Sequence, residues 1–211
     1  MNDMLGTPES RVALIERAKA ILIRPKEEWP KIADESTSIG DLLKTYVAPL
    51  IVIGPIALLI GSQLFGIDVF IGTFRPSLSS SLATAVTGVV MALISLAVVT
   101  IIAEVLAPSF GGEANRRQAF KLVAYAMTSV WVAGIVNVIP ALGVIGLLAA
   151  IYSLYLLYLG VTPLMKVPQD KVPVYTAVVV LGAIVASFVT GRIAIAFSGL
   201  LGASLPSPYL T

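Results

Sequence analysis

The sequence predicts an all-α membrane protein: a bundle of five transmembrane helices preceded by a cytoplasmic amphipathic helix. Three observations carry this prediction. The 211 residues are 57% hydrophobic and only 12% charged, which is more apolar surface than a soluble domain of this length can bury. Five apolar stretches are long enough to cross a bilayer core of about 30 Å. Lys and Arg gather in alternate connections between these stretches, as in membrane proteins that follow the positive-inside rule.

Composition also excludes several classes of function. The chain has no Cys and no His, so disulfides, thiolate metal sites and His-based catalysis are excluded, and we expect neither a metal nor another cofactor. A net charge of +2, without a basic stripe interleaved with aromatics, argues against a nucleic-acid partner. Neither paired acids nor a Ser-Lys arrangement is evident, so we expect no enzyme.

The N-terminal region, residues 1–44, is predicted to lay an amphipathic helix on the cytoplasmic membrane surface or on the inner face of the bundle. Thr7 and Pro8 have the pattern of an N-cap followed by Pro at the first helical position. One helical face collects Leu14, Ile15, Ala18, Ile21 and Leu22. Pro25 is expected to end this helix or to start a new one, and Trp29 to anchor at the membrane interface. The alternative is an ordinary short helix that packs on the loops.

The transmembrane part covers residues 45–200 and is followed by a short extracytoplasmic tail, residues 201–211. Its spans are predicted near residues 45–66, 82–107, 119–138, 141–163 and 173–198. Third and fourth spans are separated so briefly that they form a tight hairpin, with Pro140 pre-set for the first turn of the fourth helix. The chain is expected to keep its N-terminal region, because no cleavage site precedes the first apolar run.

Several local signals refine the spans. Ser38 with Asp41 fits a capping box, so the first helix is expected to start at Ile39. Pro49 and Pro55 are expected to kink that helix, because each lacks a backbone donor. Small residues spaced by four allow helices to approach closely. These pairs are Ala57 with Gly61 and Gly182 with Ala186.

Charge in the connections sets the orientation. Of the 14 Lys and Arg residues, all except Arg75 and Arg192 fall in the N-terminal region and around the second and fourth connections. An excess of Lys and Arg marks the cytoplasmic side. The N-terminus is therefore expected in the cytoplasm and the C-terminus outside it.

Glu104 is the acidic residue within the predicted spans, about one turn from Pro108 at the cytoplasmic boundary, where a charge costs less than at mid-bilayer. Three interpretations are open. Glu104 pairs with Arg116, Arg117 or Lys121 and fastens the second and third spans; or it stays protonated and bonds to a neighbouring helix; or it is a proton or cation ligand. The third interpretation lacks a partner acid in another span.

Tyrosines concentrate toward the inner half of the predicted bundle. Because a buried Tyr hydroxyl usually finds a partner, Tyr125, Tyr152 and Tyr155 are predicted to form a polar cluster with Glu104 or to line a substrate path. Asn137, at the outer end of the third span, is predicted to cap or cross-link helices there.

Gly111 and Gly112 follow Pro108 and are predicted to turn the chain sharply at the cytoplasmic surface. A Gly-rich loop before a helix can also hold a phosphate, but the Walker spacing for a nucleotide is missing. The ligand that the pattern favours is a lipid head-group phosphate, held by the loop amides with Arg116 or Arg117. These four residues and Trp29 are the predicted lipid or partner contacts, whereas Pro108, Asn137 and Pro140 are assigned structural roles.

Five segments in this order resemble bacterial members of the Yip family, the Ypt-interacting-protein domain. They are RAKAILIRPKEEWPKI (17–32), APSFGG (107–112), AFKLVAYAMTSVW (119–131), IPALG (139–143) and IYSLYLLYLGVTPLMKVPQDKVPVYTAVV (151–179). The resemblance, over about residues 15–195, implies a five-span bundle with a cytoplasmic N-terminus and no established catalytic residue. Eukaryotic relatives are associated with vesicle traffic, membrane shaping and lipid-modified small GTPases. Where many bacterial members read Thr-Pro before the tryptophan, this chain has Thr128-Ser129, without the proline that would kink the helix.

The sequence therefore favours a non-enzymatic protein of the bacterial cytoplasmic (inner) membrane that organises lipid or protein partners at the cytoplasmic face. Anionic lipid head groups are the expected partners, with protein partners or a homo-oligomer as alternatives. The competing hypothesis is a small oligomeric transporter or channel that uses Glu104 and the inner tyrosines. That hypothesis requires a continuous water-accessible cavity that reaches Glu104.

Overall fold

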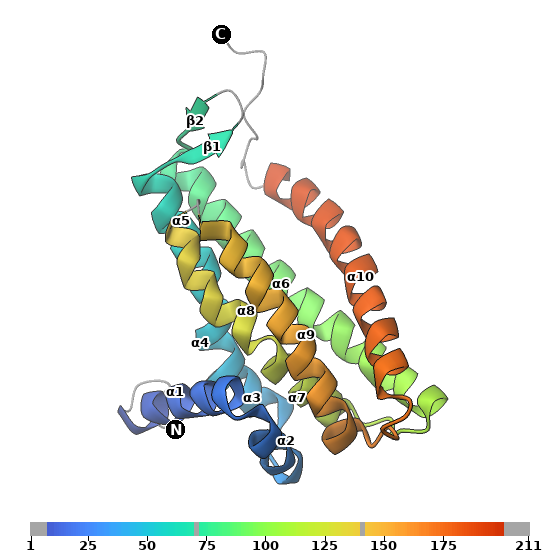
Figure 1. Ribbon diagram of the computed structural model, residues 1–211. Helices are drawn as coiled ribbons and strands as arrows, with labels where there is room; N and C mark the ends of the chain where they lie inside the picture. The colour runs from blue at the N-terminus through green and yellow to red at the C-terminus, as the bar shows by residue number, and fades with distance from the viewer. Residues whose placement is uncertain (1–7, 70–71, 140–141, 201–211) are drawn as a thin grey trace.

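Five helical segments are long and apolar enough to span a bilayer, in a computed structural model that describes residues 8–69, 72–139 and 142–200 (Figure 1). They are Ile39–Leu64, Leu78–Phe110, Arg116–Val138, Val144–Met165 and Val172–Ile193. The predicted all-α class with five spans is confirmed, and each segment overlaps its predicted range. The predicted tail, residues 201–211, lies outside the described residues.

Most spans contain more than one helical element. The first is built from α3 (Ile39–Leu42), the π-helical η1 (Leu43–Val47), α4 (Ala48–Ile51) and α5 (Ile53–Leu64). The second contains α6 (Leu78–Leu106) and the 3-10 helix η2 (Ala107–Phe110). The third contains α7 (Arg116–Ala126), α8 (Thr128–Ala133) and the 3-10 helix η3 (Gly134–Val138). The fourth and fifth are α9 (Gly143–Met165) and α10 (Val172–Leu200).

The first span starts and breaks where its sequence requires. The Ser38 side chain accepts a hydrogen bond from the Asp41 amide at 3.1 Å, so the predicted cap and the start at Ile39 are confirmed. Pro49 and Pro55 have no N–H to complete the helical ladder. A π-helical turn precedes Pro49, and the helix is interrupted at Val52, ahead of Pro55. Both predicted irregularities are therefore present.

Two helices precede the first span, α1 (Pro8–Ile23) and α2 (Pro25–Asp34). Pro8 begins α1 and Pro25 begins α2, as predicted, whereas Thr7 lies outside the described residues. In Figure 1, α1 lies crosswise to the long helices at one end of the bundle, which we call the α1 end. Residues 111–115, which lead directly into Arg116 and Arg117, and residues 166–171, which carry Lys166 and Lys171, lie at the same end.

The predicted apolar face of α1 needs one correction. Ala18 and Ile21 are buried, but Ile15 is 62% exposed, as are Val12 and Ile23 to a similar degree. Successive positions in a helix are turned by about 100°, so Ile15 points away from the side that packs on the bundle. The helix therefore carries apolar residues on two sides, one buried against the bundle and one largely exposed.

The opposite end carries a feature that the sequence analysis does not predict. Strands β1 (Ile67–Val69) and β2 (Gly72–Phe74) form an antiparallel hairpin with Ile67 opposite Phe74. We call this the hairpin end. The two strands have three residues each, so the fold class remains all-α.

The third span is interrupted although no proline stands just before Trp131. The helix is interrupted at Met127, between α7 and α8, and Thr128 is fully buried there. After η3 the chain reverses into α9, so the predicted hairpin of third and fourth spans is confirmed. Pro140, assigned to its turn, lies outside the described residues.

Small residues bring the helices close, as predicted. A methyl group on Gly61 would approach the carbonyl oxygens of Val138 and Asn137 to 2.5 and 2.7 Å. Asn137 thus lies against the first span, which it approaches through its backbone carbonyl. A methyl group on Gly182 would approach Ile102 to 3.0 Å, so α10 packs tightly on α6 at this point.

We predict that Gly61→Ala lowers the free energy of unfolding by about 1 to 3 kcal/mol, because the added methyl meets rigid backbone atoms. The measurement is the thermal unfolding midpoint of the detergent-solubilised protein. Gly146→Ala is the matched control, since nothing lies within 4 Å of the added methyl. Equal midpoints for both variants would contradict the close packing of η3 on α5.

Candidate functional site

Trp29 lies inside the protein rather than at the lipid boundary. Its side chain is 1% exposed, and a methyl group on Gly160 of α9 would come within 2.8 Å of the indole ring. The edge of the ring meets Tyr125, with ring centroids 6.3 Å apart. The prediction that Trp29 anchors at the interface or contacts lipid is therefore wrong, because the absence of a side chain at Gly160 opens a socket for the indole.

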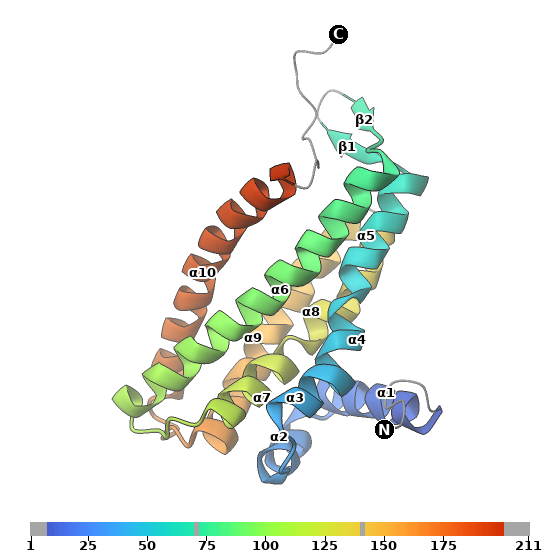
Figure 2. The ribbon, with the colours of Figure 1, turned by 180° about the vertical axis from the view of Figure 1, so that it is seen from behind.

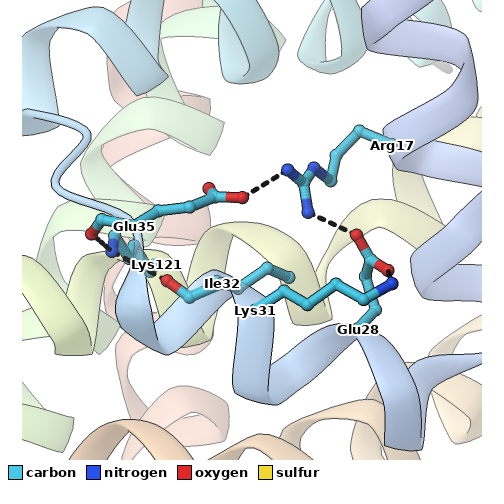
Figure 3. A network of polar contacts seen from close by, with 6 residues as sticks. All are labelled: Arg17, Glu28, Lys31, Ile32, Glu35 and Lys121. Carbon is cyan, nitrogen blue, oxygen red and sulfur yellow. Dashed lines mark hydrogen bonds and ion pairs between the residues drawn. The ribbon is translucent and has the colours of Figure 1, made fainter.

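A set of charged side chains holds α1 and α2 together, and we call Arg17, Glu28, Lys31, Glu35 and Lys121 the charged clamp (Figure 3). The guanidinium of Arg17 donates to the carboxylates of both Glu28 and Glu35. Lys31 reaches the second oxygen of Glu28 at 3.1 Å. Glu28 is only 6% exposed, so its charge needs these partners. The N-terminal helices are thus fixed to each other by ion pairs that centre on the buried carboxylate of Glu28, with Arg17 and Glu35 partly exposed.

The charge of Arg17 is secure in this environment. Burial by itself lowers the pKa of its guanidinium, but electrostatic attraction to Glu35, Tyr125 and Glu28 outweighs that effect. The pKa of Arg17 therefore lies above its ordinary value. Arg17 stays charged at every pH at which the fold is expected to persist.

Lys121 connects the clamp to the membrane-spanning part. It comes from α7, is 1% exposed, and donates to the carbonyl of Ile32 at 2.8 Å and to the carbonyl of Glu35. Gln118, one turn earlier, donates to the carbonyl of Ala33 at 2.9 Å. The last carbonyls of a helix have no partner within it, and a cation there also opposes the helix dipole. The third span therefore caps the C-terminus of α2.

The fourth span caps α1 in the same way. The hydroxyl of Tyr152 donates to the carbonyl of Leu22 at 2.6 Å, which belongs to the last turn of α1. Nearby, Tyr46 packs on Tyr125 with ring centroids 4.6 Å apart and shares a hydrogen bond of 2.8 Å with Thr128. Both N-terminal helices thus end on side chains from within the bundle.

Glu104 forms an ion pair with Arg116, Oε2 to Nε at 2.6 Å. This is the first of the three interpretations, in which the second and third spans are fastened at their inner ends. Arg117 is exposed, and Lys121 is engaged by α2. Among the described contacts of Glu104 there is none with Tyr125, Tyr152 or Tyr155.

The predicted polar cluster therefore does not assemble. Tyr125 is buried against Trp29 and Tyr46, Tyr152 bonds to α1, and Tyr155 is 42% exposed. Another tyrosine, Tyr175, contacts the residue that precedes Glu104: its hydroxyl donates to the carbonyl of Ala103 at 2.6 Å. Each tyrosine hydroxyl that has a described partner bonds to a backbone carbonyl or a threonine of another helix, and not to a carboxylate.

The Gly111-Gly112 turn is confirmed, but its amides are already occupied. Gly111 has a φ of +81°, a conformation that favours glycine. Its amide donates to Pro108 at 3.0 Å, and the Gly112 amide donates to Ala107 at 2.9 Å. The Glu113 amide donates to Met165 at 2.8 Å and ties the loop to α9. A phosphate held by these amides is therefore contradicted, because the donors that it needs cap η2 and α9.

A cavity of about 590 Å³ lies among the spans. Among the described residues that line it there is no charged side chain and no tyrosine, and Glu104 is not one of them. Asn137 is in the lining. The polar path that a transporter would require is thus not formed around Glu104.

We predict that Lys121→Met releases α2 from the bundle, because the carbonyls of Ile32 and Glu35 lose a charged donor worth about 2 to 3 kcal/mol. Hydrogen exchange of the α2 amides is expected to accelerate by more than about tenfold. Arg117→Met is the matched control, four residues away and exposed, and should leave exchange unchanged. Similar exchange in the two variants would refute the capping role of Lys121.

We predict a small effect for Glu104→Gln. Its partner Arg116 has a side chain that is 60% exposed, and such pairs contribute about 1 kcal/mol or less. The thermal midpoint should fall only slightly and match that of Glu113→Gln, which removes the exposed pair with Lys166. A loss as large as that caused by Lys121→Met would show that Glu104 has a role beyond this pair.

Comparison with known proteins identifies a family for most of this chain. A family model described as the Yip1 domain matches residues 19–191, from α1 through α10. No curated protein and no solved structure matches the chain. The matched residues contain all of α2 and the greater part of every span, together with most of the charged clamp. The chain belongs to the Yip1 domain family.

Proposed function

We propose that this integral membrane protein organises anionic lipid at the cytoplasmic leaflet of a bacterial inner membrane through the outward side of α1. Its five apolar spans and its family support the membrane assignment. The single observation that carries the proposal is the exposed surface of α1. There Val12, Ile15 and Ile23 are 59, 62 and 64% exposed.

Basic residues surround these apolar side chains. Arg11, Lys19 and Arg24 are all exposed, with the acid Glu16 among them and Glu27 at 3.9 Å from Arg24. An interfacial helix binds by burying apolar side chains while its cations attract anionic head groups. Each exposed Val or Ile contributes about 1 kcal/mol on entering lipid, and each cation near an anionic surface about 1 kcal/mol.

The position of α1 supports the same conclusion. The charged clamp and Tyr152 hold α1 crosswise to the spans, at the end where the basic connections lie (Figure 1). The positive-inside rule assigns that end to the cytoplasm. Because α1 is already held crosswise to the spans, it does not lose conformational entropy by becoming ordered when it binds lipid head groups.

The proposed role is non-enzymatic and does not depend on transport. The chain has no His or Cys for catalysis, and no described observation favours a polar path through the bundle. Trp29, Gly111 and Gly112 have no part in the proposed lipid contact, because they are committed within the protein. Arg117, which is exposed at the same end, remains a candidate contact.

We predict that replacing Arg11, Lys19 and Arg24 together by Gln weakens retention of phosphatidylglycerol at least about tenfold, since three cations leave the anionic surface. Native mass spectrometry after gentle extraction counts the retained lipids. Replacing Arg75 and Arg192 by Gln, on the opposite side, is the control and should change nothing.

An equal loss in both variants, or no loss in either, would refute the role of α1. A second protein that dissociates only from the α1 variant would replace lipid by a protein partner. A homo-oligomer that retains no phosphatidylglycerol would likewise contradict the proposal.

A further inference from the structure

The cavity among the spans has the shape of a long slot. On α6 its lining runs from Thr84 to Val99, a length of about 22 Å at 1.5 Å per residue. On the third span it runs from Val123 to Asn137. One leaflet of a bilayer contributes about half of the 30 Å hydrocarbon core. The slot is therefore longer than the hydrocarbon layer of a single leaflet.

The walls are suited to hydrocarbon. Small residues set the width of the slot at several levels, including Gly54, Gly88, Ala92 and Ala183. The few hydroxyls in the lining are largely occupied: Thr84 bonds to Ser80, Ser153 to Met127 and Ser187 to Ala183, all within the protein. Apolar cavities of this kind stay free of water and take apolar ligands. The volume, about 590 Å³, lies within the range of ligand sites.

The slot is accessible from the side. Leu154 of α9 and Ile184 of α10 both line it and are 44 and 46% exposed, so lining residues reach the lipid-facing surface on both helices. In Figures 1 and 2, α10 runs along the outside of the bundle, and it packs against both α6 and α9. Close packing at Gly182 attaches α10 to α6, and the partly exposed Ile184 forms one lip of the opening.

We propose that this slot binds one acyl chain of a membrane phospholipid, which enters sideways between α9 and α10. At this depth the surrounding medium is hydrocarbon, and the lining consists mainly of apolar side chains, with no charge to attract an ionic ligand. The bound chain completes the packing between α10 and the rest of the bundle. This site is separate from the head-group contact proposed for α1, and it requires no anionic lipid.

The experiment uses the full chain in vesicles of phosphatidylcholine that carries a photoreactive diazirine in mid-chain. After irradiation, peptide mass spectrometry maps the adducts. We expect adducts on slot residues such as Ala92, Ser95 and Ala183. Adducts confined to outward residues of α6 and α10 would overturn the proposal without any variant.

The matched variants place leucine inside or outside the slot. Ala92→Leu with Ala183→Leu fills it, and slot adducts should fall at least about fivefold because the chain is displaced. Ala97→Leu with Ala177→Leu, at exposed positions on the same helices, should leave them unchanged. Equal adducts in both, or a protein cross-link from a second copy through Leu154 and Ile184, would overturn the proposal. Because phosphatidylcholine is zwitterionic, failure here leaves the phosphatidylglycerol experiment on α1 independent.

Discussion

A buried lysine that caps a helix outside the membrane determines how the parts of this protein fit together. Lys121 lies in the third span with almost no exposure, where an unpaired charge would be costly. The Lys121 ammonium donates to carbonyls at the end of α2, and these carbonyls have no hydrogen-bond partner within their own helix. Because the buried ammonium needs acceptors and the carbonyls need donors, their hydrogen bonds hold α2 on the bundle. Arg17 then extends the constraint to α1 through Glu28 and Glu35.

Function follows from this arrangement. Because the charged clamp and Tyr152 hold α1 on the bundle, its second apolar side faces outward with basic residues beside it, where the proposed function places lipid head groups. The acid inside the spans plays a lesser part, since Glu104 is held by Arg116 near the surface. The slot along α6 is lined mainly by apolar side chains and by no charged one among the described residues. Both proposed sites therefore address lipid, one through charge at the surface and one through hydrocarbon within the bundle.

The spans could be predicted from local signals, whereas the contacts between residues distant in sequence could not be predicted. Length, hydropathy, the Ser38 cap and the missing donors of Pro49 and Pro55 act within a turn or two of their own positions, and the structure confirms them. Glu104 and Arg116 flank the Gly111-Gly112 turn, so their ion pair was one of the three interpretations of Glu104. Trp29 was misplaced because its socket, Gly160, is far away in sequence, and the clamp joins Ile32 to Lys121 across 89 positions. The sequence signal that could have indicated the clamp was a lysine, Lys121, inside an apolar span.

The most direct test of this account is cysteine cross-linking between α2 and the third span in native membranes, with a short bismaleimide reagent. The chain has no cysteine, so one pair can be introduced without interference. The Gln118 side chain reaches the Ala33 carbonyl at 2.9 Å, so Ala33→Cys with Gln118→Cys is predicted to be bridged by the reagent. Lys26→Cys with Gln118→Cys, with the first position exposed at the other end of α2, is predicted not to be bridged. Equal yields for both pairs, or no cross-link in either, would show that α2 does not dock on the bundle and would contradict the account.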